Sequence, residues 1–320
     1  MTINKGRILT MFFPILLITG NWFIPFQKQE NMSTNNPRKV AKIVKSSVSH
    51  MGEILMKQPL PSRDLEMIDP FLLLHHHGPA FFKPNNSGLP FGPHPHRGFE
   101  TVTLIIKGDV KHRDSNGFES VIESGGVQWM TAGKGLVHSE RSSEKFKEQG
   151  GELELIQLWV NLPASKKMVE PHYEGLQKKD IPQIVKNGGD IIIDLISGSF
   201  DEEIVAGKGQ YPIDLYSITL HKNATQAFYI PQQNNILFYI LEGKVLVNDK
   251  VAEKHELVLF ENQGTDLKIK AESTARILLG HALPINEKVV SHGPFVMNSE
   301  QELYDAINDY KSGKMGSLEE

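Results

Sequence analysis

Two pairs of potential metal ligands stand out in the sequence, each with one residue between its members. The first pair is His94 and His96 in the triplet HPH, and the second is His138 and Glu140 in the triplet HSE. Side chains two positions apart on a β-strand point to the same face, so each pair presents two ligand groups in one direction. Three imidazoles and a carboxylate form a donor set typical of a divalent transition metal. An octahedral ion held by these four groups would keep two positions for water, substrate or O2, as a catalytic site requires.

The pattern leaves two alternatives open. The four residues could be unrelated polar side chains, although Gly92 and Gly98 flank the first pair as expected for tight turns at the mouth of a barrel. Glu100 also competes for the carboxylate role, because it follows the first pair closely. We favour Glu140 since it shares a strand face with His138, and we interpret Glu100 as an acceptor that orients an imidazole N–H.

The overall composition narrows the kinds of protein that this chain can be. Its 320 residues are enough for two ordinary domains or one large domain. The 34 Lys and Arg residues against 38 Asp and Glu give a net charge of −4, which provides no electrostatic reason to expect direct nucleic-acid binding. The absence of cysteine excludes disulfide scaffolds, thiolate zinc sites, iron–sulfur clusters and cysteine nucleophiles. Any metal must therefore be bound by His, Asp and Glu.

The elements that must position these ligands are short β-strands. Apolar runs rich in β-branched and aromatic residues are separated by turn residues, at 101–106, 153–160, 191–196, 215–220, 236–241, 257–260 and 275–279. An internal repeat also aligns LIIKGDV at 104–110 with YILEGKV at 239–245. Each segment has an apolar run, a turn glycine and a valine in register, as a β-hairpin does. The sequence therefore predicts an all-β fold made of two similar barrels.

A short helix is expected after the second barrel. Ser299 and Glu302 form a capping box, and Leu303, Ile307 and Tyr310 follow at helical spacing. These patterns divide the chain into an N-terminal extension, a metal-binding barrel, a second barrel without metal ligands, and a helix with its tail, at residues 1–38, 39–165, 166–298 and 299–320.

The N-terminal extension, residues 1–38, is expected to lie outside the barrels. Lys5 and Arg7 precede an apolar stretch at 8–26, which is the charge order of a signal peptide or signal anchor. Proline and glycine interrupt this stretch, however, and no small-residue cleavage site follows it. Met32 offers a second possible start, which would make the preceding residues an upstream reading-frame extension. We expect a cytoplasmic protein, with export or membrane anchoring through the apolar stretch as the alternative.

Several motifs together resemble those of the pirin family within the cupin superfamily. They are HPHRGFETVT at 94–103, QWMTAGKGLVHSE at 128–140, QLWVNLP at 157–163, KMVEPHY at 167–173 and HGPFVMN at 292–298. The resemblance extends from about Lys39 to the C-terminal helix. It implies a bicupin fold with a mononuclear Fe(II) in the N-terminal cupin, bound at His94, His96, His138 and Glu140. Mn, Co, Ni, Cu or Zn could replace the iron at a site of this donor type.

The resemblance implies two functions of different kinds. Many pirins are described as quercetin 2,3-dioxygenases, and others as regulators that bind transcription factors or metabolic enzymes. We expect an oxidoreductase that cleaves a flavonol-like substrate with O2, in which Glu140 takes the substrate hydroxyl proton as general base. The alternative is a non-enzymatic, redox-sensing protein whose metal state alters a surface that a partner protein recognises. In either case we expect a monomer.

The sequence departs from the family pattern in two places. Tyr229 and Pro231 of the second barrel align with the first ligand pair, so we expect one metal site per chain. The triplet HHH at 75–77 stands where many pirins have an acidic-aromatic segment. If this segment is a strand, His75 and His77 share a face and could line the entrance of the metal pocket. The alternative interpretation is that these histidines lie on the surface or in a second layer.

Overall fold

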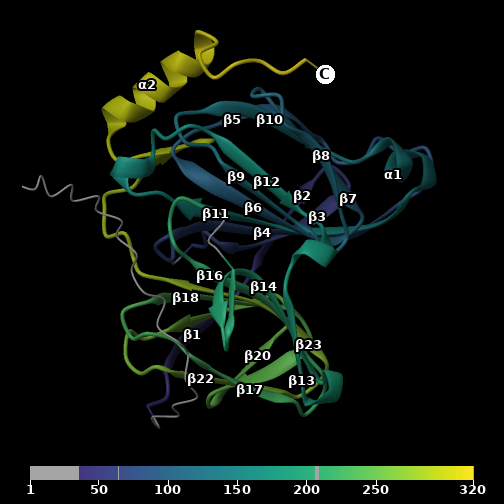
Figure 1. Ribbon diagram of the computed structural model, residues 1–320, viewed down its shortest axis with the longest axis vertical. Helices are drawn as coiled ribbons and strands as arrows, with labels where there is room; N and C mark the ends of the chain where they lie inside the picture. Colours follow the sequence, from purple (N-terminus) through teal and green to yellow (C-terminus); the bar gives the residue numbers. More distant parts are fainter. Residues whose placement is uncertain (1–35, 64, 206–208, 320) are drawn as a thin grey trace, which may run out of the picture.

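The chain folds into two stacked β-barrels, with helix α2 (Glu300–Lys311) at the top of the upper barrel (Figure 1). The computed structural model describes residues 36–63, 65–205 and 209–319. Strands dominate these residues, which confirms the expected all-β fold with a C-terminal helix. The same residues contain no helix with the length and apolar character that a membrane span requires. The apolar stretch at 8–26 lies outside the described residues.

The first barrel consists of a seven-stranded sheet that faces a four-stranded sheet. The larger sheet contains β2 (Ser47–Met51), β3 (Ile54–Leu60), β4 (Phe71–Phe82), β6 (Phe99–Lys107), β9 (Val127–Thr131), β11 (Gly151–Asn161) and β12 (His172–Leu176). The smaller sheet contains β5 (Phe91–His96), β7 (Asp109–Asp114), β8 (Glu119–Glu123) and β10 (Leu136–Arg141), and helix α1 (Glu144–Gln149) follows β10. Neighbouring strands follow the orders β12-β9-β6-β11-β4-β3-β2 and β5-β10-β7-β8. The two strands with the predicted ligands, β5 and β10, are therefore adjacent.

The second barrel has the same plan, with an eight-stranded sheet that faces a four-stranded sheet. The larger sheet contains β1 (Val40–Lys45), β13 (Gln183–Lys186), β14 (Ile191–Phe200), β15 (Glu203–Val205), β16 (Asp214–Leu220), β18 (Asn235–Glu242), β21 (Glu256–Phe260) and β23 (Ala275–Ala282). The smaller sheet contains β17 (Thr225–Tyr229), β19 (Lys244–Val247), β20 (Lys250–Glu253) and β22 (Asp266–Ala271). A hairpin of β24 (Val290–His292) and β25 (Phe295–Met297) precedes α2, and short 3-10 turns occur at Ala164–Lys166, Lys178–Asp180 and Asn187–Gly189.

The predicted internal repeat is confirmed by the order of the strands. The order β9-β6-β11-β4-β3 in the first barrel matches β21-β18-β23-β16-β14 in the second. The smaller sheets match as well, since β5-β10-β7-β8 corresponds to β17-β22-β19-β20. The aligned segments lie at the β6–β7 and β18–β19 connections, so Thr103 on β6 corresponds to Phe238 on β18.

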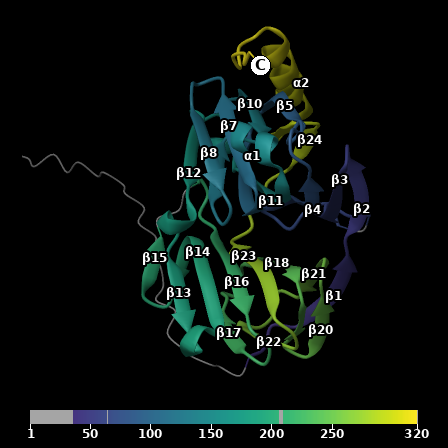
Figure 2. The ribbon, with the colours of Figure 1, turned by 90° about the vertical axis from the view of Figure 1, so that its right-hand side faces the viewer.

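Two strands belong to a different barrel from the one that their position in the sequence suggests. β1 precedes the first barrel but pairs with β21 of the second, with Val40 opposite Phe260 (Figure 2). β12 follows the expected boundary at residue 165, yet it pairs with β9 of the first barrel. Helix α2 also packs on the first barrel, where Leu303 and Ala306 belong to the same buried apolar cluster as Val137 of β10.

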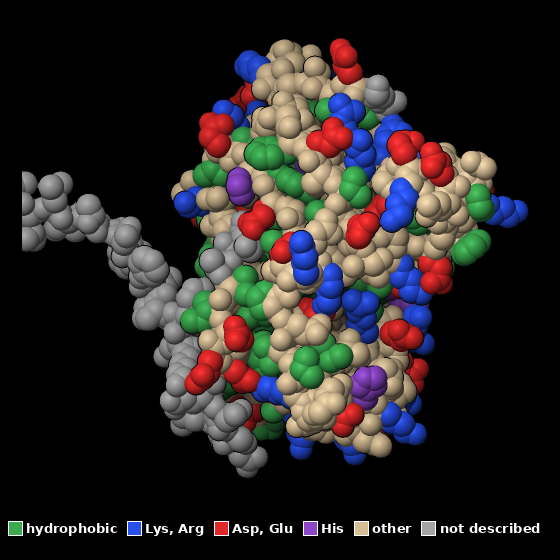
Figure 3. Space-filling model, turned by 45° about the vertical axis from the view of Figure 1, so that its right-hand side comes forward, with side chains coloured by type: hydrophobic (Ala, Val, Ile, Leu, Met, Phe, Trp, Pro, Cys, Tyr) green, Lys and Arg blue, Asp and Glu red, His purple; other side chains and the backbone are tan. Residues whose placement is uncertain are grey.

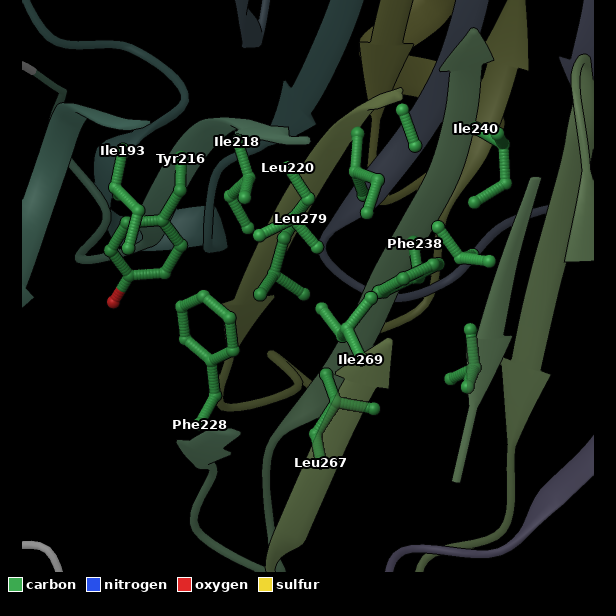
Figure 4. Packing of buried hydrophobic residues seen from close by; sticks show 14 of the residues in the cluster. Ile193, Tyr216, Ile218, Leu220, Phe228, Phe238, Ile240, Leu267, Ile269 and Leu279 are labelled. Carbon is green, nitrogen blue, oxygen red and sulfur yellow. The ribbon is translucent and has the colours of Figure 1, made fainter. Parts of the chain in front are cut away.

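The interior of the second barrel is filled with apolar side chains. Phe228, Phe238, Leu267, Ile269 and Leu279 point toward one another between its two sheets (Figure 4). These side chains are almost fully buried, so the hydrophobic effect stabilises this half of the molecule.

The two barrels join through a second apolar cluster, formed by the outer faces of their larger sheets. Leu158 of the first barrel and Leu237 and Leu278 of the second belong to this cluster, and all three are fully buried. The outside of the molecule is charged instead, and Figure 3 shows acidic and basic side chains interspersed over one face. The apolar contact between the barrels makes them one packed unit.

Candidate metal centre

Three of the four predicted ligand residues meet on the adjacent strands β5 and β10. His138 lies directly opposite His94 in the strand register, and the Nε2 atoms of these two rings are 2.9 Å apart. The ring centroid of His96 is 4.9 Å from the centroid of each of the other two rings. One ring nitrogen of each histidine lies within 4.8 Å of the other two. A single ion placed between them could contact all three imidazoles.

Hydrogen bonds fix the tautomers of two of the three imidazoles in a way that suits metal binding. His94 donates its Nδ1 proton to the carbonyl oxygen of Gly92 at 2.7 Å, and His96 donates its Nδ1 proton to that of Pro294 at 3.4 Å. Because a carbonyl oxygen only accepts, each neutral ring then carries its lone pair on Nε2. The Nε2 atom of His96 is buried without a hydrogen-bond partner. These donors therefore fit a divalent metal ion.

Burial keeps two of these ligands uncharged. The side chains of His96 and His138 are buried, with 3% and 1% of their surface exposed. Burial, assisted by the neighbouring imidazoles, lowers the pKa of His96 to about 3 and the pKa of His138 well below its usual value. Only the neutral imidazole binds a metal, so neither ring has to release a proton at neutral pH before an ion binds.

The carboxylate of Glu140 is held by two side chains of the larger sheet. Thr103 donates to its Oε1 at 3.0 Å, and the Nε2 of Gln157 donates to its Oε2 at 2.8 Å. The ligand atoms within 4.8 Å of one another are those of the three imidazoles, and the carboxylate is not among them. A β-bulge in the β5–β10 pairing falls at this point, where two steps along β10, from His138 to Glu140, match three steps along β5. Coordination by Glu140 stays a prediction.

The competing carboxylate, Glu100, faces the opposite side of its sheet. Its Oε1 accepts from the hydroxyl of Thr131 at 2.6 Å and from the backbone N–H of Gln210 at 2.8 Å. Burial raises the pKa of Glu100 above its usual value. Thr103 lies three residues further along β6 and points into the barrel, so strand alternation turns Glu100 toward the second barrel. These contacts give Glu100 a structural role between the two halves.

A buried lysine fixes the loop that follows His96. The ammonium group of Lys167 donates to the carbonyl oxygens of Gly98 and Val296, at 2.8 and 3.1 Å, and to the side-chain oxygen of Asn161 at 2.6 Å. Gly98 has a φ of +88°, and a Cβ there would lie 2.0 Å from the Val296 carbonyl oxygen. Only glycine fits at this position, so Lys167 and Gly98 together determine how β5 turns into β6.

The histidine triplet lies on a strand, β4, and its members point to two sides. His75 and His77 share the inner face of the first barrel, with their ring centroids 5.9 Å apart, and His77 packs edge-on against Phe91 of β5. His76 points outward to the contact between the barrels. There its Nε2 donates to Glu154 at 2.8 Å, and its Nδ1 accepts from the hydroxyl of Tyr239 at 3.0 Å.

The burial of His77 predicts a loss of stability in acid. Burial, with smaller contributions from the neighbouring charges, lowers its pKa to about 3. An unfolded chain binds this proton near pH 6.5, so the stability present above that pH is lost as the pH falls toward 3. Between about pH 7.5 and about pH 5, metal-free wild type should lose about 2 kcal/mol more unfolding free energy than His77→Phe. Denaturant unfolding at both pH values measures this difference.

An exposed histidine supplies the control for that comparison. His50→Phe changes a histidine on β2 that is open to solvent, so this variant should lose as much stability in acid as wild type does. Equal acid losses in wild type and His77→Phe would contradict the role assigned to His77.

Sequence reasoning missed part of the surroundings of the triad. The ring of His112 lies 5.5 Å from the ring of His138, stacks on Tyr173 at 3.9 Å, and its Nε2 contacts Asp114 at 3.1 Å. The i, i+2 spacing of His112 to Asp114 on a strand was the available signal, since both side chains face the same way.

The fold and the site together define a class of protein. Two duplicated barrels, with an i, i+2 histidine pair and a third histidine on the adjacent strand of the first barrel, make this chain a bicupin. The chain belongs to the pirin family. The Pirin family model matches residues 53–160, and the model of the Pirin C-terminal cupin domain matches residues 215–316. The resemblance inferred from the sequence motifs is thereby confirmed.

Relatives of known name agree with this assignment. A pirin-like protein of Solanum lycopersicum is 35% identical over 291 residues, covering 88% of this chain and 94% of its own length. A pirin-like protein of Caulobacter vibrioides is 35% identical over 280 residues, covering 87% and 99%. The crystal structure of a quercetin 2,3-dioxygenase from Acinetobacter baumannii has a TM-score of 0.82 at 35% identity and covers 88% of this chain and 100% of that chain.

Proposed function

We propose that this chain is a metal-dependent dioxygenase that cleaves a flavonol-like substrate with O2 in its first barrel, with Fe(II) as the metal. The observation that carries the proposal is the convergence of three imidazole nitrogens, two of them on rings whose tautomers are fixed by hydrogen bonds to backbone carbonyl groups. A structural relative of 35% identity bears the name quercetin 2,3-dioxygenase, which supports the choice of substrate.

The residues of the first barrel have distinct roles in this proposal. His94, His96 and His138 would hold the ion, with Glu140 predicted as a fourth ligand. When bound, the ion would supply Lewis acidity and a template that brings substrate and O2 together. Glu140 would take the proton of the substrate hydroxyl, and the two hydrogen bonds from Gln157 and Thr103 hold its oxygen atoms in place.

The proposal is tested by loading and turnover in one preparation. Protein purified without oxygen and loaded with Fe(II) should contain about one metal equivalent per chain, because the histidine cluster found among the described residues lies in the first barrel. Addition of quercetin should then produce oxygen consumption that requires both metal and protein. Full metal loading with no flavonol turnover would replace the enzyme by the redox-sensing regulatory alternative.

A comparison of two carboxylates tests the role of Glu140. Glu140→Gln is expected to retain much of the metal, because an amide oxygen can still coordinate, but to lose most turnover because the amide is no base. Glu100→Gln is expected to leave metal content unchanged, since Glu100 contacts Thr131 and Gln210 instead. Metal content and quercetin-dependent oxygen consumption should be measured on both variants. Metal loss in Glu100→Gln with none in Glu140→Gln would reverse the two roles.

A further inference from the structure

A row of polar side chains crosses the inner face of the larger sheet of the first barrel. Gln128 on β9 lies opposite Thr103 on β6, Thr103 lies opposite Gln157 on β11, and Gln157 lies opposite His75 on β4. Directly opposite residues of antiparallel strands project to the same side, with Cβ atoms about 4.5–5.5 Å apart. Thr103 and Gln157 both reach Glu140 on the facing sheet, so this polar row points into the barrel.

At the corresponding positions of the second barrel, this row consists of apolar and aromatic side chains. Thr103 corresponds to Phe238, which lies opposite Val258 and Leu279, and Leu279 lies opposite Tyr216. These four residues belong to the core of the second barrel, where Figure 4 shows three of them packed together. The duplicate of the barrel is therefore stable with an apolar row, and the amide, hydroxyl and imidazole groups of the first barrel are not needed for the fold.

The two rows also differ in the solvent exposure of their side chains. Tyr216 and Leu279 are fully buried at 0% exposure, whereas His75 and Gln157, at the corresponding positions, are partly exposed although they face inward. The facing sheet therefore does not fully cover His75 and Gln157, as it covers their counterparts in the second barrel. Gln157 also donates to Glu140, so the exposed part of the row adjoins the proposed catalytic carboxylate.

Several polar atoms on and beside this row have no hydrogen-bond partner. The Nε2 of His75, the Nδ1 of His77, the Oε1 of Gln128 and the Nε1 of Trp159 are buried and have no partner. His77 and Gln128 are each only 2% exposed. Buried polar atoms of this kind usually receive a partner, and these include neutral donors and acceptors without a net charge. Such a lining matches hydroxyl and carbonyl groups on an uncharged ring better than phosphate or carboxylate groups.

We propose that His75 and its neighbours on the polar row form a subsite that recognises hydroxyl groups on the substrate ring farthest from the metal. This inference rests on the proposed function, because it places an aromatic enol with its reacting oxygen at the triad. The side chain of His75 then determines specificity among flavonols and takes no part in the chemistry.

Direct binding measurements test the subsite separately from turnover. The probes are quercetin, whose rings carry several hydroxyl groups, and 3-hydroxyflavone, which has the same enol without the others. Titration calorimetry on zinc-loaded protein keeps both ligands intact, because zinc has no redox chemistry. Wild type should bind quercetin more tightly than 3-hydroxyflavone by about tenfold. His75→Phe should reduce this preference by about three- to tenfold, mainly through weaker quercetin binding, since one hydrogen bond is lost.

Two variants and one comparison decide the outcome. His75→Gln retains hydrogen-bonding capacity and should keep most of the preference, and His172→Phe, an exposed change on β12, should keep all of it. Equal weakening of both ligands in His75→Phe, or a wild type that shows no preference, would overturn the subsite. Preference for quercetin without any oxygen consumption by the iron form would retain the subsite and remove the proposed enzyme. Turnover of both flavonols with no effect of His75→Phe on the binding preference would retain the proposed enzyme and remove the subsite. Binding of neither ligand would remove both the enzyme and the subsite.

Discussion

Replacing His138 with alanine is expected to remove the metal from the first barrel and with it all quercetin-dependent oxygen consumption. The ring of His138 faces both other imidazoles from the adjacent strand, with its centroid 4.3 Å from that of His94 and 4.9 Å from that of His96. The two imidazoles that remain both lie on β5, and only the predicted carboxylate ligand Glu140 is left on β10, which is too few ligands from that side to retain the ion. Elemental analysis and oxygen-electrode measurements on the same sample would record both losses.

An exposed histidine gives the matched control for this loss. His172→Ala removes an imidazole from β12 of the same barrel, outside the triad, and should leave both metal content and oxygen consumption at the wild-type level. A full metal equivalent retained in His138→Ala would contradict the proposed ligand set.

Replacing Lys167 with methionine should give a large loss of stability. Methionine has a similar length but no donors, so the three oxygens that Lys167 contacts would be left buried without a partner. An unsatisfied buried acceptor costs about 1–3 kcal/mol, and partial relaxation should limit the total loss to about 3 kcal/mol. Denaturant unfolding of the metal-free protein would show this loss as a lower midpoint with an unchanged slope.

The neighbouring lysine allows a close comparison. Lys166→Met introduces the same side chain one position earlier, where the lysine is exposed, and should change the unfolding free energy by less than about 0.5 kcal/mol. Equal losses in the two variants would mean that the buried ammonium group contributes nothing specific.

The strands that build both barrels could be predicted from local patterns. The apolar runs at 101–106, 153–160 and 236–241 all lie within strands, because β-branched residues and turn glycines carry local information about the backbone. The helix α2 begins after Ser299, as its capping box indicated. The repeat could be recognised because both barrels keep the same turn glycine.

The pairing of strands over long distances could not be predicted in this way. Nothing in the composition of β1 distinguishes an edge strand of the second barrel from one of the first, and β12 lies beyond the residue at which the patterning suggested a boundary. Such pairings depend on shape and register across the whole molecule, which local propensity does not contain.

In the candidate site, too, the features set by spacing along one strand could be predicted, whereas contacts between different strands could not. The i, i+2 spacing in HPH and HSE was sufficient to predict the histidines that meet, because strand alternation fixes their common direction. The hydrogen bonds that Glu140 receives from Thr103 and Gln157 join three different strands, and no spacing along the chain indicates them. The carboxylate is therefore the ligand for which experiment matters most.

The position of β1 has a consequence for how the protein is made. A ribosome releases β1 before either barrel exists, but its partner β21 is synthesised only near the end of the chain. The first barrel can close while translation continues, since its own strands are by then complete, whereas Val40 must wait for Phe260. Until then β1 is an unpaired strand that other growing chains could bind, so crowded synthesis should favour aggregation through this segment.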